Sequence, residues 1–403
     1  MTPRTTPSAA DILRDAQGFS LFIGGPLFQL LRRAHLSDDA LLLVRRRVAV
    51  ITLFAWLPLF LLAALQGQLV GHSVAVPFLR DVEVHIRFLV VVPLLIVAEL
   101  VVHQRLHSIG WAFLERKLIP EAAAARFDEA LTSTFRLRNS VLAELLLLAV
   151  VYGVGVHLVW RPNTVVDVPT WYVTSSAAGS RLSPAGIWYG YVSLPIFQFL
   201  LLRWYYRLLL WTWFLWRVSR IELNLIPTHP DRVGGLGFLA NTAYAFTLLM
   251  AAHGGMLAAQ IANGIFFFGK SLPEFKIEIA VIVAFLLCIV FGPLLVFAPQ
   301  LARAKRVGLL EYGTLAERYV REFDVKWLRG GASADEPLVG SGDIQSLADL
   351  SNSFEVVRGV RLAPVSKEAL LRLTVAVLLP MAPLLLTMMP LETLLRKLVG
   401  LVF

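Results

Sequence analysis

The chain has 403 residues, of which 57% are hydrophobic and only 16% are charged. Its mean hydropathy is +0.69, whereas a soluble domain of this length would expose far more charged side chains. The formal net charge of +9 could indicate nucleic-acid binding in a soluble protein. Here the arginines cluster in loops on one predicted face, which is the positive-inside pattern of a membrane protein. We therefore exclude nucleic acid as a partner.

Two local features narrow the class further. The single cysteine, Cys288, lies within an apolar run, so the sequence excludes an intrachain disulfide and any multi-cysteine metal site. The N-terminal stretch MTPRTTPSAADILRDAQG is polar and contains acidic residues, and no apolar stretch precedes Leu21. It does not have the pattern of a cleaved signal peptide.

Seven apolar runs approach the length that a transmembrane helix needs, about 20 residues for about 30 Å of hydrocarbon. They predict an all-α, polytopic bundle of membrane helices. Gly254 and Gly255 are expected to interrupt the fifth run, and Pro380 and Pro383 to break the seventh. In chain order the runs are residues 48–65, 86–102, 141–160, 187 to beyond 216, 236–268, 277–299 and 370–389.

The distribution of lysine and arginine predicts the orientation of the spans. Seven arginines precede residue 48, six basic residues lie in 103–138, and ten lie in 301–369. The alternate loops carry only Arg80, then Arg161 and Arg181, then Lys270 and Lys276. This contrast predicts a cytoplasmic N-terminus. Seven spans place the C-terminus outside, unless the prolines of the last run form a re-entrant hairpin that returns the tail to the cytoplasm.

The predicted organisation has four parts. Residues 1–47 form a cytoplasmic N-terminal segment, and residues 48–300 hold six membrane helices with a cytoplasmic helical loop at 103–138. Residues 301–369 form a cytoplasmic subregion of helices and loop, and residues 370–403 hold the last membrane helix and an amphipathic tail.

The subregion 301–369 contains the glycine- and acid-rich loop GGASADEPLVGSGD between two helical stretches. On the second stretch Ile344, Leu347, Leu350 and Phe354 share one helix face. Because the segment is too short to build a sizeable core of its own, we expect it to pack under the membrane bundle.

The stretch HPDRVGGLGFL lies between the fourth and fifth spans, on the predicted cytoplasmic side. We expect Asp231 to accept hydrogen bonds from backbone N–H groups near Gly234 or Gly235 and so cap the fifth helix. The alternative is a site for an anion or lipid headgroup formed by His229, Asp231, Arg232, Gly234 and Gly235, since helix N-termini beside glycines attract anions. The spacing matches neither a P-loop nor GxGxxG.

Ionisable groups inside the predicted spans form a second candidate site, because a charge in lipid is costly and usually faces protein or water. Arg203 and Arg207 share a face of the fourth span. We expect them to pair with Glu99 or Glu144, to line an aqueous cavity, or to extend toward the cytoplasm. The predicted intramembrane polar path consists of Glu99, Glu144, His157, Arg203, Arg207 and His253.

Histidines raise two further hypotheses. His157 and His253 lie at similar depth and could face each other across a proton path or a haem, but we favour two separately packed side chains. Glu99, His103 and His107 share one helix face with metal-ligand spacing. Without an HExxH core this metal candidate is not specific, and we predict no cofactor. The aromatic residues of the fourth span are expected to form an interfacial belt, namely Trp204, Tyr205, Tyr206, Trp211, Trp213 and Trp216.

Two stretches of the sequence resemble a known family, and this resemblance indicates where the protein is located. HPDRVGGLGFL and GSGDIQSLADLSNSFEVVRGVRLAPVSKEALLRLTVAVLLPMAPLLL resemble stretches of a family of bacterial polytopic inner-membrane proteins to which no activity is assigned. The resemblance covers most of the chain and implies the bacterial inner membrane. It carries over no catalytic or binding residues.

Three functions remain open. The favoured one is a channel or transporter for a small ion or anionic solute, with the intramembrane polar path as its lining. A membrane enzyme that acts on a lipid or phosphorylated substrate would use His229, Asp231 and Arg232, but GxSxG and HExxH are absent and we lean against it. A non-catalytic scaffold or sensor would bind a cytoplasmic protein through residues 301–369. The lipid bilayer is a partner in each case, and a homo-oligomer is also open.

The orientation can be tested directly. A reporter fused after Gly330 should be cytoplasmic, and one fused after Ser176 should be periplasmic, because the loops rich in lysine and arginine stay inside. Paired alkaline phosphatase and green fluorescent protein fusions at both positions give the readout. The opposite result at either position would contradict the orientation.

Overall fold

The computed structural model describes residues 24–26, 28–29, 43–70, 74–160, 170–176, 179–333 and 335–388. Within this part of the chain, seven helical runs are long and apolar enough to cross a membrane, which confirms the predicted all-α, multi-pass fold. The end of the predicted seventh span and the predicted amphipathic tail lie outside the described residues. The runs are Val44–Leu65, Val82–Glu115, Val141–Leu158, Pro184–Val218, Thr247–Phe268, Leu272–Leu328 and Lys367–Thr387.

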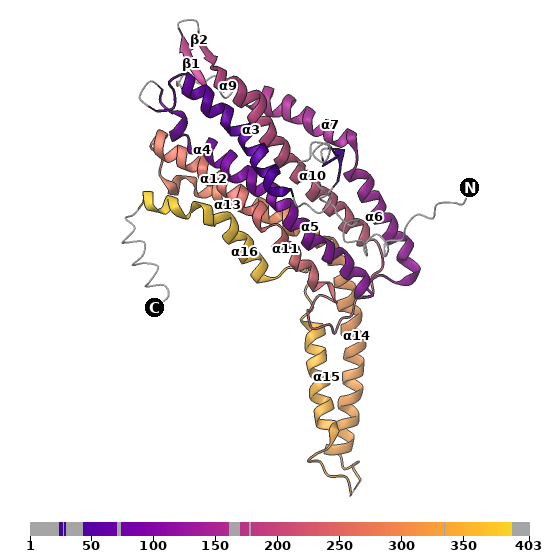
Figure 1. Cartoon of the computed structure of the whole chain (residues 1–403). Coiled ribbons are helices and arrows are strands. Elements are labelled where there is room, and N and C mark those ends of the chain that lie inside the picture. Colours follow the sequence, from indigo (N-terminus) through magenta and orange to yellow (C-terminus); the bar gives the residue numbers. More distant parts are fainter. Residues whose placement is uncertain are drawn as a thin grey trace, which may run out of the picture.

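The seven runs differ in how deeply they are buried. In the apolar window of Thr247–Phe268, 61% of residues are buried, against 11% in the window of Val141–Leu158. The helices α5 (Val92–Glu115) and α10 (Leu194–Val218) contribute many buried residues beside α12 (Thr247–Phe268). Figure 1 shows these helices packed side by side in one elongated bundle.

The remaining elements complete the bundle and its ends. A small antiparallel β-hairpin pairs Val173 with Leu182 at one end of the bundle (Figure 1). The other α-helices are α3 (Val44–Leu65), α4 (Val82–His85), α6 (Ala124–Arg138), α7 (Val141–Val150), α9 (Pro184–Trp188), α11 (Thr242–Ala245), α13 (Lys276–Phe291) and α16 (Lys367–Leu378), and the strands are β1 (Val173–Ser176) and β2 (Gly179–Leu182). Segments of 3₁₀-helix are Phe78–Arg80, Glu121–Ala123, Leu236–Asn241, Leu272–Phe275, Gly292–Phe297 and Leu379–Thr387, and π-helical segments are Ile86–Val91, Val151–Trp160, Tyr189–Ser193 and Asp324–Leu328.

The fifth span departs from its predicted form. The chain bends at Phe246, between α11 and α12, and the two glycines expected to interrupt the span lie inside α12. A Cβ atom at Gly254 would lie 2.1 Å from the carbonyl oxygen of Val377 on α16. Gly254 therefore allows two membrane helices to approach closely, a common use of small residues at such interfaces.

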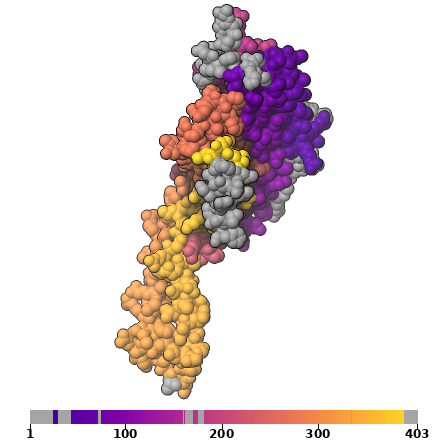
Figure 2. Space-filling model, turned by 90° about the vertical axis from the view of Figure 1, so that its left-hand side faces the viewer, coloured from indigo at the N-terminus to yellow at the C-terminus, as the bar shows by residue number. Residues whose placement is uncertain are grey.

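The region predicted to pack under the bundle projects from it instead. Helix α14 (Ala298–Phe323) continues the sixth membrane run without a break, and α15 (Gly342–Arg358) returns beside it. Together they form a helical hairpin that extends away from the bundle in both views (Figures 1 and 2). The predicted boundary at residue 300 thus falls within a continuous helical run.

The two helices of the hairpin pack against each other. Leu347, Leu350 and Phe354 of the predicted apolar face are half-buried, whereas Ile344 is 48% exposed. We call the end of the bundle from which α14 and α15 project the hairpin end, and the end that carries β1 and β2 the distal end.

Candidate functional site

A buried cluster of charged side chains joins three helices about halfway along the run Val82–Glu115, on the hairpin side of Asp81. Glu99 of α5 accepts hydrogen bonds from Nη2 of Arg47 at 2.7 Å, from Nη1 of Arg207 at 2.7 Å and from Nη1 of Arg203 at 3.1 Å. The four side chains are no more than 8% exposed. This geometry confirms the prediction that Arg203 and Arg207 pair with an acidic residue.

Glu144 extends the cluster to a fourth helix, α7. Its Oε1 lies 3.7 Å from Nε of Arg203, and Nη2 of Arg203 also donates to the carbonyl oxygen of Gly24 at 3.2 Å. Both predicted acidic partners therefore face the same guanidinium. A buried ion pair is tolerated only when its geometry is good and its other polar atoms find partners.

Arg47 has donor capacity left. Its Nη2 bonds to Glu99 and to the carbonyl oxygen of Ile96 at 3.4 Å. Its Nε is buried without a hydrogen-bond partner among the described residues, although Arg47 as a whole is only 2% exposed. A buried N–H group without a partner is costly, so this edge of the guanidinium is a candidate contact for a ligand.

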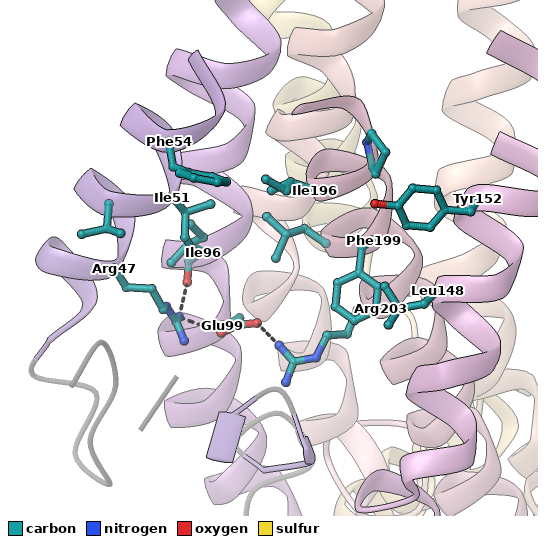
Figure 3. A pocket seen from close by; sticks show the side chains of 13 residues that line it. Arg47, Ile51, Phe54, Ile96, Glu99, Leu148, Tyr152, Ile196, Phe199 and Arg203 are labelled. Carbon is teal, nitrogen blue, oxygen red and sulfur yellow. Dashed lines mark hydrogen bonds and ion pairs between the residues drawn. The ribbon is translucent and has the colours of Figure 1, made fainter. Parts of the chain in front are cut away.

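A cavity of about 310 Å³ is lined by Arg47, Glu99 and Arg203 of this cluster. In Figure 3, Arg47 and Arg203 reach Glu99 from opposite sides at one end of the cavity, and apolar side chains surround the rest. The apolar wall consists of Val50, Ile51, Phe54, Ile96, Leu148, Tyr152, Pro195, Ile196, Phe199 and Leu200. The cavity thus combines one cationic end with an apolar body.

The cavity is bordered by residues on the lipid-facing side of the bundle. Val50 and Phe54 of α3 are 42% and 52% exposed, and Leu148 of α7 and Tyr152, which follows it, are 39% and 42% exposed. The cavity therefore lies close to the outer surface of the bundle, between α3 and the third span.

The two histidines of the predicted path do not join the cluster. Nδ1 of His253 donates to the carbonyl oxygen of Leu249 at 2.8 Å, which leaves Nε2 to accept from the hydroxyl of Tyr205 at 2.8 Å. His157 is exposed on the third span. The structure places the two side chains in separate surroundings, in agreement with the hypothesis that we favoured.

The metal hypothesis gains no support. Both carboxylate oxygens of Glu99 are engaged by guanidinium groups. Within the described part of the chain, no group of three histidine, cysteine, aspartate or glutamate residues is placed to hold a metal ion. The spacing of Glu99, His103 and His107 therefore does not produce a ligand set there.

The HPDRVGG turn is organised by Asp231. Its Oδ1 accepts from the backbone N–H groups of Val233 at 2.9 Å and Gly235 at 3.2 Å, and its Oδ2 accepts from Gly237 at 2.8 Å. Nδ1 of His229 lies 2.9 Å from Oδ1 of the same carboxylate. The predicted hydrogen bonds are confirmed, with Gly235 as one donor. They satisfy three N–H groups in the turn and at the start of the 3₁₀ segment Leu236–Asn241, ahead of α12.

The same turn holds the loop that follows the hairpin. The carbonyl oxygen of Arg232 accepts from the backbone N–H of Arg361 at 2.8 Å, and that of Asp231 accepts from Nη2 of Arg361 at 3.1 Å. The exposed Arg232 guanidinium has no hydrogen-bond partner among the described residues. An anion or headgroup at Arg232, Gly234 and Gly235 stays a prediction.

The sequence analysis did not identify the buried positions of two arginines. The positive-inside rule treats Arg47 as a charge that flanks the first span, yet it lies in the buried cluster. Arg87 lies inside the predicted second span and bonds to Glu83 and to the hydroxyl of Tyr189. For Arg87 a signal was present, because an ionisable residue within an apolar run is rare without a partner.

Comparison with protein-family models, curated proteins and solved structures finds no match for the chain. The site is therefore interpreted from its geometry.

The cluster leads to a stability prediction. Glu99→Gln should lower the free energy of unfolding by about 3–5 kcal/mol, because it leaves three buried guanidinium groups without their shared counter-charge. The matched control is Glu129→Gln, which removes an exposed partner of Arg217 at 2.7 Å and should cost about 0–1 kcal/mol. Thermal unfolding in detergent measures both. Equal losses would contradict the role assigned to Glu99.

The turn leads to a pH prediction. Burial raises the pKa of Asp231, but hydrogen bonds from the N–H groups of Val233, Gly237 and Gly235 outweigh it and hold the pKa below its ordinary 3.8. The ionised carboxylate then adds stability that is present above the unfolded pKa of about 3.9 and is lost as the pH falls through the folded value. Asp231→Ala should cost about 1 kcal/mol at pH 7, and its deficit should shrink below about pH 4. Thermal unfolding at pH 7 and 3.5 tests this, and a deficit that does not change with pH would contradict the assignment.

Proposed function

We propose that the protein is a carrier in the bacterial inner membrane that binds an anionic amphiphile, a molecule with one negatively charged head and an apolar chain. The observation that carries this proposal is the cavity with a cationic end formed by Arg47 and Arg203 and an otherwise apolar wall. The head would lie against the guanidinium groups, and the chain would fill the apolar body.

The chemistry of the cationic end favours a carboxylate or phosphate head. Guanidinium groups bind such anions with paired, charge-assisted hydrogen bonds. Both Arg47 and Arg203 line the cavity, and Nε of Arg47 has no hydrogen-bond partner among the described residues. Glu99 holds the arginines together. Its negative charge would also repel a head with more negative charge than the guanidinium groups can balance.

The wall favours an amphiphile over a hydrated ion. A volume of about 310 Å³ lies at the lower end of the range for small-molecule sites, about 300–1,000 Å³. The ten apolar side chains of the wall cannot replace the water around an ion. This narrows the sequence hypothesis from a small ion or anionic solute to an anionic amphiphile, and favours a carrier over a channel.

The proposed orientation places the charged head near the inner leaflet. Arg47 lies in the first turn of α3, and the lysine and arginine pattern assigns this end of the helix to the cytoplasm. The amphiphile would enter sideways between α3 and α7 with its head toward the cytoplasm, in the orientation of a lipid of the inner leaflet.

A scaffold or sensor remains the second candidate, and the projecting hairpin favours it. Its outer surface exposes large apolar side chains, among them Leu310 at 73% and Leu328 at 71%. Exposed apolar residues on a projecting element are common at protein interfaces. A scaffold has no need of a ligand in the cavity, so a ligand-binding test separates the two candidates.

The test uses the full chain purified in a neutral detergent, with dodecyl phosphate as the probe and dodecanol as its uncharged analogue. Dodecyl phosphate should raise the melting temperature, since a ligand at about 100 times its Kd adds about 2.7 kcal/mol of stability. Ile196→Trp fills the cavity and should abolish most of that shift. Leu209→Trp, on the exposed side of the same helix at 66% exposure, should keep it.

A second arm measures transport. In vesicles, movement of a fluorescent single-chain phosphate lipid between leaflets should be faster with wild type and Leu209→Trp than with Ile196→Trp. An equal shift with dodecanol, or equal shifts in both tryptophan variants, would contradict binding in the cavity. Binding without any movement between leaflets would contradict the carrier and favour a sensor.

A further inference from the structure

We propose that a second cavity, at the distal end, binds the primary ammonium group of a small polar solute between Asp81, Thr170 and Asn263. The cavity measures about 550 Å³, and Glu83, Tyr172 and Lys270 also line it. It shares no residue with the first cavity, which Arg47 and Arg203 line. The proposal is therefore independent of the proposed carrier function.

Asp81 is the anionic centre of this cavity. It is 5% exposed, and all its hydrogen-bond donors are neutral. Oδ1 accepts from the backbone N–H of Val84 at 3.3 Å and from Nδ2 of Asn263 at 2.9 Å, and Oδ2 accepts from Nε1 of Trp171 at 2.9 Å. A carboxylate has about four acceptor positions, so one position on Oδ2 is left for a further donor.

Two more acceptors in the same cavity lack donors. Oγ1 of Thr170 and Oδ1 of Asn263 are buried without a hydrogen-bond partner among the described residues. Thr170 is only 9% exposed. Buried polar atoms normally have partners, and leaving them unpaired costs free energy. The cavity therefore has an excess of acceptors and selects a ligand rich in donors.

The neighbouring charges leave Asp81 uncompensated. Glu83 pairs with Arg87, which also bonds to the hydroxyl of Tyr189, so these two charges balance each other. Lys270 is exposed at the rim, where its Nζ lies 5.5 Å from the centre of the Phe275 ring. One net negative charge thus remains in the interior, at Asp81.

A primary ammonium group matches this arrangement. It carries three N–H donors and one positive charge, which correspond to the free acceptors and to the charge of Asp81. The rings of Tyr172 and Tyr189 in the wall also favour a cation. A divalent metal fits less well, because N–H groups already occupy both oxygens of Asp81.

The experiment measures thermal stability of the purified full chain with three probes at constant ionic strength. Ethanolamine carries charge and N–H donors, tetramethylammonium carries charge without N–H donors, and ethylene glycol carries no charge. Wild type should be stabilised by ethanolamine, weakly by tetramethylammonium and not by ethylene glycol. Calcium chloride is the fourth addition and should have no effect.

The substitution Thr170→Val tests the proposal by changing the protein instead of the ligand. It removes a hydroxyl that interacts with the hydroxyl of Tyr172 but accepts no hydrogen bond from the described residues, so the fold without ligand should lose little stability. The affinity for ethanolamine should fall about tenfold, since a hydrogen bond to a charged group is lost. Thr52→Val is the matched control: Thr52 is also 9% exposed with an unpartnered Oγ1, but it does not line this cavity, and its affinity should match wild type.

The outcomes separate the alternatives. The proposal would be overturned if ethanolamine did not stabilise the wild-type protein. This measurement does not depend on whether a variant folds. Equal stabilisation by tetramethylammonium would overturn the assigned role of the N–H donors. Stabilisation by calcium alone would indicate a metal site instead. An unchanged affinity in Thr170→Val would place the ammonium elsewhere.

Discussion

The shared carboxylate of Glu99 is the constraint on which the rest of the bundle depends. A guanidinium in the apolar interior is costly unless it has a counter-charge, and here one glutamate serves Arg47, Arg203 and Arg207. Because these arginines come from α3 and α10 while Glu99 comes from α5, the three helices must keep one rotation and one height relative to each other. The same requirement positions the cationic end of the apolar cavity. Packing around the cluster is therefore less free to vary than packing elsewhere on α3, whose outer face is exposed.

The two cavities place opposite charges at two heights along one helical run. Asp81 precedes the run Val82–Glu115, and Glu99 with its three arginines lies farther along it. Among the residues that line the first cavity the unpartnered group is a donor, Nε of Arg47. Among those that line the second cavity the unpartnered groups are acceptors, on Thr170 and Asn263. The ligands that we propose for the two cavities therefore differ in chemistry. A shift of this run along its axis would change both cavities together, since Glu83 lines one, Glu99 lines the other, and both lie on the run.

The sequence predicts those features whose absence would cost much free energy within a short stretch of the chain. The spans follow from apolar length, the pairing of Arg203 and Arg207 follows from the cost of charge in lipid, and the Asp231 cap follows from the free N–H groups at a helix start. What the sequence leaves open is the rotation of each helix, which depends on packing between elements far apart in the chain. Trp204 and Trp211 illustrate this. They were expected in an interfacial belt, but they are only 2% and 0% exposed, and Nε1 of Trp204 donates to the carbonyl oxygen of Leu95 at 3.0 Å. The belt interpretation was wrong for these two residues, while Trp213 and Trp216 are 39% and 37% exposed.

The glycines of the HPDRVGG turn have a structural reason that the sequence pattern only partly reveals. Gly234 and Gly235 have φ angles of +65° and +98°, and Arg232 shares this left-handed region at +56°, where a side chain is normally disfavoured. The conformation turns the N–H groups of Val233, Gly235 and Gly237 toward Asp231, and it leaves the carbonyl oxygens of Asp231 and Arg232 facing Arg361. Because Arg361 follows α15 directly, the turn joins the start of the fifth span to the base of the projecting hairpin. The turn that the Asp231 carboxylate organises therefore also sets where a long helical hairpin is attached to the bundle, which explains why so polar a turn lies between two apolar spans.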